Sequence, residues 1–199
     1  MPKSIAGTTV LTYNETANGL ALEATFTGGT PPATADTFAP GSLLTDLSDG
    51  SEYVNSGTSA APVWDAKVMS KTVALTAANL IAMYATPVAV VAAVPGKAIV
   101  VDSIDFVMAR TSTAFTGGST VAVQYAATAN GAGTATHATI AASVVTGTVG
   151  TTYTARIPVV LSDVASASIA GVGLFISNIT AAFAAGTGTA TLKVKYHLV

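Results

Sequence analysis

The end of the sequence alternates between apolar and polar residues. This period of two is typical of a β-strand with one buried face, and the segment 152–161 shows the same pattern on one face. We therefore predict two half-buried strands. Their apolar residues are Leu192, Val194, Tyr196 and Leu198 in the first and Tyr153, Ala155, Ile157, Val159 and Leu161 in the second; Thr191, Lys193, Lys195 and His197 are the polar residues of the first.

The same pattern predicts one β domain over residues 67–199. Apolar runs are separated by glycine, proline and asparagine, which are typical of turns. Residues 76–84 are predicted to form a short helix, with Thr76 as N-cap and Pro87 preventing its continuation. The fold class we expect is all-β, an antiparallel β-sandwich of the jelly-roll type. The predicted strands are 67–73, 87–94, 98–110, 119–128, 136–145, 152–161, 168–178 and 189–199.

A β-hairpin segment is predicted at 41–66. A strand at 43–47 is followed by a turn at 48–50, where Asp-Gly favours a tight reversal, and by a returning strand at 51–55. A second turn leads to the only tryptophan. Because a lone hairpin is barely stable, its large apolar residues must cover either the main domain or another subunit. These interaction candidates are Leu43, Leu47, Tyr53 and Trp64.

Residues 1–40 are expected to form an extended N-terminal arm. The run Gly28-Gly29-Thr30-Pro31-Pro32 opposes regular structure, so 27–40 is predicted to be a linker. Two earlier segments, 8–13 and 20–26, are candidates for strands that pair with a neighbour.

Composition narrows the function. Hydrophobic residues make up 50% of the chain and charged residues 9%, against about 25% charged in an ordinary soluble domain. A surface with so few charged side chains suits proteins that pack permanently into assemblies, because removing a charged group from water is costly. The net charge of −2 and the sparse basic residues argue against nucleic acid as a partner. Without cysteine there is no disulfide, thiol nucleophile or thiolate metal site.

A membrane partner is not expected either. The N-terminus has no signal-peptide pattern. Residues 73–94 carry no charge and are long enough to span a bilayer, but Asn79 and the central Pro87 favour a short helix followed by a buried strand.

The titratable residues do not suggest catalysis. Neither His137 nor His197 has an acidic residue or a second histidine within three positions. Asp102 and Asp105 differ in parity, so we expect them on opposite faces of one strand. We expect no enzyme activity, no cofactor and no metal.

Three carboxylates cluster at the hairpin turn. Asp46, Asp49 and Glu52 do not match the ligand spacing of a calcium loop, and turn stabilisation explains them better than a cation site. Arg110 and Arg156 are the only arginines, too few to form an anion-binding cluster.

Two stretches resemble known proteins. Residues 40–46, 50–58 and 62–64 are similar to a hairpin segment of tailed-bacteriophage virion proteins, and 75–80, 86–88 and 94–101 resemble the opening of jelly-roll domains in such proteins. The resemblance implies a virion protein assembled in the host cytoplasm: a capsid decoration, cement or head-fibre protein. It also implies a homotrimer whose N-terminal arm attaches to the major capsid protein or to another virion protein.

Alternative functions remain open at this level. A receptor-binding tail-fibre or spike tip would contact the host surface through the loops 110–118, 129–136 and 146–151, but Phe115 is their sole aromatic residue, which argues against sugar stacking. A polysaccharide depolymerase needs paired carboxylates, which the sequence does not offer. A secreted surface-layer or adhesin fragment shares the composition, but the missing signal peptide weighs against it.

Overall fold

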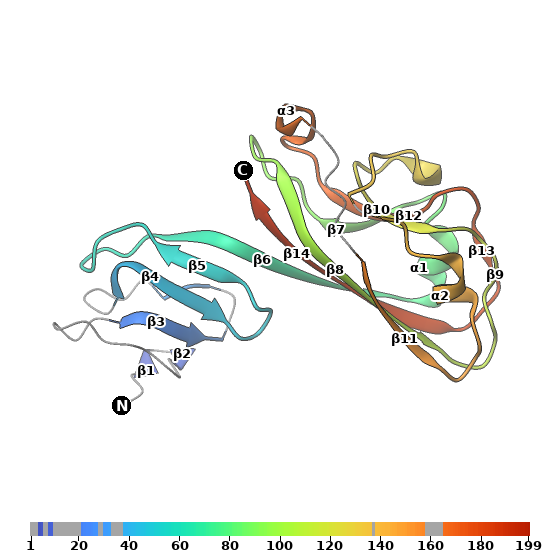
Figure 1. The fold of residues 1–199 in the computed structure, drawn as a ribbon, viewed down its shortest axis with the longest axis horizontal. Helices are drawn as coiled ribbons and strands as arrows, with labels where there is room; N and C mark the ends of the chain where they lie inside the picture. Colours follow the sequence, from blue (N-terminus) through green and yellow to red (C-terminus); the bar gives the residue numbers. More distant parts are fainter. Residues whose placement is uncertain are drawn as a thin grey trace. The chain divides into compact units, whose positions relative to one another are not determined.

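The computed structural model shows a mostly β protein, with 48% of residues in strands and 11% in helices (Figure 1). It describes residues 4–5, 8–9, 21–27, 30–32, 38–136, 138–157 and 165–199. The chain forms two compact units, unit 1 (Met1–Ser70) and unit 2 (Lys71–Val199). In the described part of the chain, no helix is long and apolar enough to cross a membrane.

Unit 1 is built around the predicted hairpin. Strand β4 (Phe38–Asp46) pairs antiparallel with β5 (Glu52–Asn55), which pairs antiparallel with β6 (Trp64–Leu75). On its other side β4 pairs in parallel with β3 (Ala21–Phe26) of the same chain, and β1 (Ser4–Ile5) pairs with β2 (Thr8–Thr9). Strand β4 begins inside the segment predicted to be a linker, and a register shift accommodates Pro40 and Gly41.

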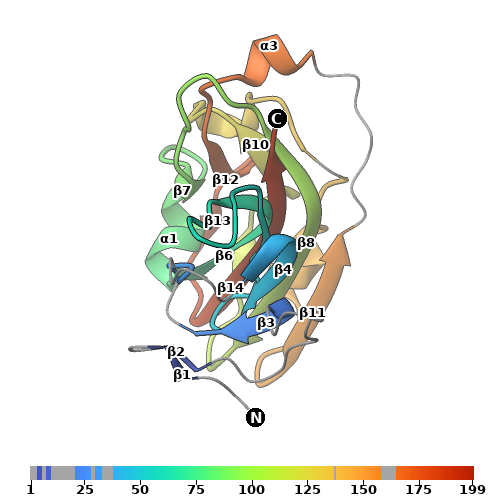
Figure 2. The same ribbon diagram turned by 90° about the vertical axis from the view of Figure 1, so that its left-hand side faces the viewer.

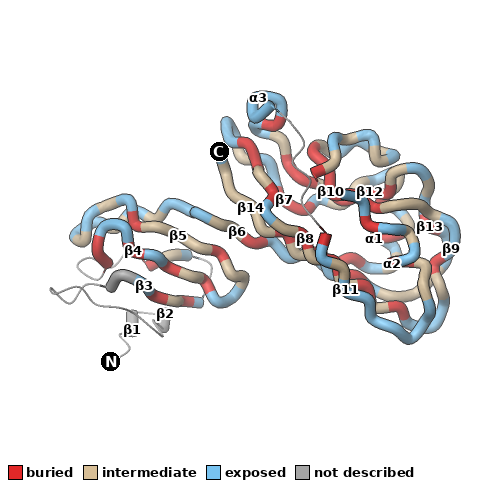
Figure 3. Tube along the Cα trace, viewed as in Figure 1, coloured by how far each residue is buried: buried red, intermediate tan, exposed pale blue. Residues whose placement is uncertain are grey.

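Among the residues that the structure describes, the core of unit 1 is small. Four buried hydrophobic residues of β3 and β4 form a cluster, with Tyr53 and Trp64 packed against it. Figure 3 shows buried segments on both strands. This cluster buries little apolar surface, and apolar burial is the main favourable contribution to folding. The four residues are Ala24, Phe26, Phe38 and Leu44.

Side-chain hydrogen bonds close two turns in the described part of unit 1. The Asp46 carboxylate accepts hydrogen bonds from the backbone and hydroxyl of Ser48, and Asp49 accepts one from the Ser51 N–H. The Asn55 side chain accepts from the N–H groups of Gly57 and Val63. These bonds fix the register of the hairpin, and in a sheet the register decides which side chains face the core.

Unit 2 brings two sheets together around one core. The full order of the larger sheet is β11-β8-β14-β6-β5-β4-β3, and β6 runs across the boundary between the units. A second sheet has the order β10-β12-β7, and β9 pairs with β13. Figure 2 shows β8 and β14 of the larger sheet side by side. The strands are β7 (Val88–Val91), β8 (Ile99–Arg110), β9 (Thr116–Gly117), β10 (Val121–Tyr125), β11 (Thr152–Ile157), β12 (Leu174–Asn178), β13 (Phe183–Ala184) and β14 (Gly188–Leu198).

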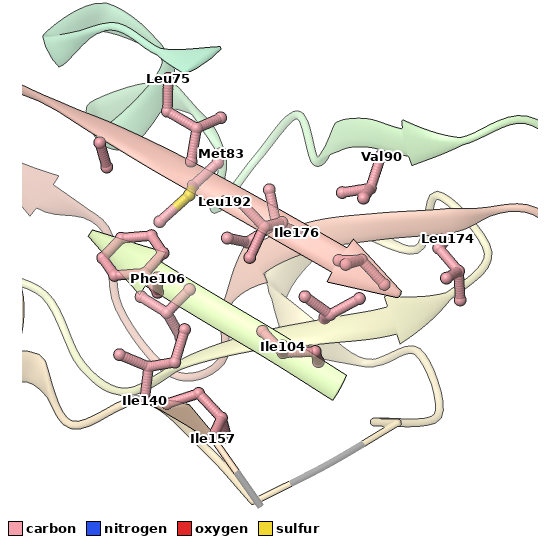
Figure 4. Close-up of a cluster of buried hydrophobic side chains, with 14 of the residues drawn as sticks. Leu75, Met83, Val90, Ile104, Phe106, Ile140, Ile157, Leu174, Ile176 and Leu192 are labelled. Carbon is pink, nitrogen blue, oxygen red and sulfur yellow. The ribbon is translucent and has the colours of Figure 1, made fainter. Parts of the chain in front are cut away.

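The core of unit 2 draws on both sheets. Phe106 and Leu192 enter from the larger sheet and Ile176 from the smaller one, and all three are fully buried (Figure 4). Every residue of β10 is buried. Strand β12 pairs with one edge of β10, and bridges to Ala135 and Ile140 lie at the other edge. Among the described residues, this core is far larger than that of unit 1.

The helices agree with the prediction in one case and differ in another. Helix α1 (Ala77–Ala82) begins after Thr76, which forms a capping box with Asn79, as the predicted N-cap requires. The strand predicted at 136–145 is wrong: after the bridge at Ile140 the chain forms helix α2 (Ala142–Thr146). The helical turn buries the adjacent Val144 and Val145 together, which a strand cannot do on one face. A 3₁₀ turn (Ala129–Gly131) and α3 (Ser166–Ile169) complete the fold.

Candidate interaction surface

The four interaction candidates lie in different surroundings in unit 1. Tyr53 and Trp64 pack on the unit's own core. The Trp64 ring meets Phe38 edge-on with centroids 5.0 Å apart, and its Nε1 donates to the Pro32 carbonyl at 2.8 Å. Burial raises the pKa of Tyr53, and the nearby Asp49 and Asp46 carboxylates raise it further, while a hydrogen bond with Ser51 opposes them.

The two leucines, in contrast, are exposed. Leu43 is 39% exposed on β4 and Leu47 is 50% exposed in the hairpin turn. Since Leu44 points into the core, the strand alternation places its neighbour Leu43 on the opposite side of the sheet.

That opposite side is an ordered face, because the sheet register aligns its residues across four strands. Glu23 of β3, Leu43 of β4, Val54 of β5 and Asp65 of β6 lie in one row. Thr45 and Glu52 belong to the next row. We call the side that includes Glu23, Leu43, Thr45, Glu52, Val54 and Asp65 the outer face of unit 1; Thr25 and Val68, paired with Thr45 and Glu52, lie on the same side.

The outer face combines an apolar centre with acidic ends. None of its three carboxylates forms an ion pair with a residue that the structure describes. The sequence of unit 1 contains two lysines and seven carboxylates, a net charge of −5. Unit 2 contains six basic and three acidic residues, a net charge of +3. The small net charge of the whole chain therefore conceals two oppositely charged units.

Several charged residues of unit 2 lie on the sheet face opposite its core. Arg156 Nε lies 3.0 Å from Asp105 Oδ1, and His197 Nδ1 lies 2.9 Å from Asp102 Oδ1. Asp105 raises the pKa of Arg156 through a hydrogen bond and its charge. The prediction that Asp102 and Asp105 lie on opposite faces is wrong, because a bulge opposite Lys195 and Tyr196 adds one residue to β8 and changes its parity.

Two lysines at the centre of that face have no ion-pair partner among the described residues. Lys193 and Lys195 are two positions apart on β14, between β8 and β6, and both are partly exposed. Their neighbours on β8 in the register are Asp105 and Ser103. We define Lys193, Lys195 and Val107, which belongs to the same face, as the lysine face.

The residues considered for a metal site or for receptor binding that the structure describes belong to a turn or to the core. Asp46 and Asp49 hold the hairpin turn, and among the described residues no group of three or more potential ligands could hold a metal ion. His137 lies outside the described residues. Phe115, the aromatic residue of the candidate receptor loops, is 1% exposed and packs edge-on against Phe183.

Sequence reasoning missed two polar contacts of unit 2. The pair of Asp102 and His197 joins residues 95 positions apart, so local spacing does not predict it. Arg110 is 7% exposed and donates to the carbonyls of Val144 and Thr148 and to the Thr151 hydroxyl. It thereby holds the end of α2 and the following loop against the end of β8.

Comparison with known proteins adds no relative: no protein-family model, curated protein or solved structure matches this chain.

Proposed function

We propose that this chain is a non-enzymatic structural protein of a tailed-phage particle that decorates or stabilises the capsid as an oligomer, with a homotrimer as the expected state. The observation that carries the proposal is a contrast in the part of unit 1 that the structure describes: its buried cluster has four hydrophobic residues, whereas the large side chains of Leu43 and Leu47 are exposed. Of the six exposed large hydrophobic residues among the described ones, Leu43, Leu47 and Val63 belong to this small unit.

Assembly would add stability to unit 1. Complete burial of a leucine side chain contributes about 1.5–3 kcal/mol, so covering the parts of Leu43 and Leu47 that are still exposed contributes about 1 kcal/mol each. The same contact in every copy of an oligomer repeats this gain.

The particle itself is inferred from the resemblance at 40–66 and 75–108. On that basis we infer a jelly-roll arrangement for unit 2 and attachment to the shell through the N-terminal arm. A protein that binds only the assembled shell stabilises that shell by mass action.

The receptor-binding alternative has less support. Phe115 is buried in the core of unit 2, and the loop around it is held by the Thr187 hydroxyl, which accepts from the N–H groups of Ser112 and Thr113. This leaves the candidate loops without an exposed aromatic side chain for a host glycan.

Sedimentation with two kinds of target tests the proposal. The purified chain is mixed with phage heads that lack it and, separately, with intact host cells. We expect saturable binding to the heads and none to the cells. The L43D/L47D double variant should lose oligomerisation, whereas V149D, which alters an equally exposed residue of unit 2, should keep it. Binding to cells together with bare heads would contradict the proposal and favour a receptor-binding tip.

A further inference from the structure

We propose that the outer face of unit 1 binds the lysine face of unit 2 in a second copy of the same chain, so that the copies associate head to tail. This inference deepens the proposed function and rests on its oligomer, because it names the surfaces through which the copies meet.

Charge complementarity carries the proposal. The outer face presents Glu23, Glu52 and Asp65, and the lysine face presents Lys193 and Lys195. None of these five groups is neutralised by an ion pair with a described residue. Since the aspartates beside the lysines already pair with Arg156 and His197, the two lysines remain available to a partner.

The spacing of the two lysines also matches the spacing of two carboxylates on the outer face. Lys193 and Lys195 lie two residues apart on one strand, which separates their Cα atoms by about 7 Å. Glu52 lies two residues from Val54, and Val54 is opposite Asp65 on the adjacent strand. One strand spacing combined with two residues along the strand separates Glu52 from Asp65 by about 8 Å. Flexible lysine side chains absorb the remaining difference.

Apolar contact accompanies the charges. Leu43 and Val54 form the centre of the outer face, and Val107 lies on β8 beside Thr191, next to the lysines. Exposed ion pairs contribute little affinity on their own, so these apolar side chains would supply area while the charges set the register and the choice of partner.

The two faces belong to different units, so the contact is heterologous. Each copy then offers one free face to a next copy, and such a contact continues until it closes into a ring. A ring of three is the closed form that matches the expected trimer.

Charge reversal on each face tests the proposal. One variant carries E52K/D65K, the second K193E/K195E, and the third all four changes; K97E alters an exposed loop outside both faces and serves as the control. Mass is measured by sedimentation equilibrium at low and high salt, with circular dichroism to verify folding. We expect wild type and K97E to be oligomeric and each double variant to associate at least tenfold more weakly. Mixing the two double variants should restore larger species, and the fourfold variant should associate by itself.

Several outcomes would overturn the inference. Unchanged association of both double variants would show that other surfaces hold the oligomer. If the fourfold variant behaves like wild type but a mixture of the two double variants forms no larger species, the contact lies within one chain. A wild-type chain that stays monomeric at all concentrations would contradict both the head-to-tail contact and the oligomer of the proposed function. Binding to phage heads is measured separately, so the proposed function can fail while the head-to-tail contact stands, and the reverse.

Discussion

Replacing Arg110 with methionine tests how the buried guanidinium stabilises unit 2. Arg110 is 7% exposed, and its donors reach the Thr148 carbonyl at 2.9 Å and the Thr151 hydroxyl at 2.6 Å as well as the Val144 carbonyl. Methionine has a similar length but no donor. The substitution therefore removes the hydrogen bonds while it keeps most of the apolar packing.

The magnitude follows from the bonds that are lost. A hydrogen bond to a charged group contributes about 1.5–3 kcal/mol, and a buried carbonyl left without a donor costs about 1–3 kcal/mol. The buried Val144 carbonyl loses its donor, while the Thr148 carbonyl keeps the Thr151 hydroxyl as a donor. Removal of a buried charge recovers part of its desolvation cost. We expect R110M to lower the free energy of unfolding of unit 2 by about 3–5 kcal/mol, a large share of the 5–15 kcal/mol that is typical of whole proteins.

Urea unfolding with two probes measures the effect. Trp64, the sole tryptophan, belongs to unit 1, so its fluorescence reports on that unit, while circular dichroism reports on the strands of both. With a slope of about 2 kcal/mol per M, the circular-dichroism transition of unit 2 should move down by about 2 M urea. The control is R156M, because the Arg156 side chain is 78% exposed and solvent screens its ion pair with Asp105. Equal effects of R110M and R156M, or a shift below about 0.3 M for R110M, would refute the reasoning.

Three further predictions follow from buried groups and close contacts. N178V should raise the melting temperature of unit 2, with a gain of about 1 kcal/mol, because both polar atoms of the Asn178 side chain are buried without a hydrogen-bond partner among the described residues; a lower melting temperature would contradict this. Burial raises the pKa of Tyr125 above 10.0, so its contribution to stability is complete below pH 10 and is lost as the pH rises through the raised value; Y125F should flatten the alkaline loss in a pH series of melting curves, and an unchanged slope would oppose the assignment. G57A should destabilise unit 1 by more than about 2 kcal/mol, as the added Cβ would lie 2.3 Å from the Ala61 carbonyl oxygen; Trp64 fluorescence reports the unfolding, and a wild-type midpoint would count against the turn geometry.

The sequence was most informative where local chemistry decides the structure. Asp49 and Gly50 close a turn through bonds within a few residues, and Thr76 caps a helix three residues from Asn79. Both features were predictable because their partners are neighbours in the chain.

The features that the sequence did not predict depend on contacts between residues far apart in the chain. The β-branched Val144 and Val145 favour a strand locally, but burial against the core and the carbonyl contacts of Arg110 accompany a helix instead. The bulge at Asp102 changes the parity of β8, and nothing in the local pattern marks it.

The candidate surface was predictable only in part. Leu43 was identifiable as an apolar hairpin residue, but its acidic neighbours Glu23 and Asp65 come from strands whose pairing the sequence does not specify. The opposite charges of the two units become visible only when the boundary at Ser70 is known.

Cryo-electron microscopy of phage heads to which the purified chain has been added tests the central claim most directly. The account predicts ordered density at symmetric positions on the shell, with β-sheet features and more than one copy at each position. Heads that stay bare at saturating concentrations of the folded chain would contradict it.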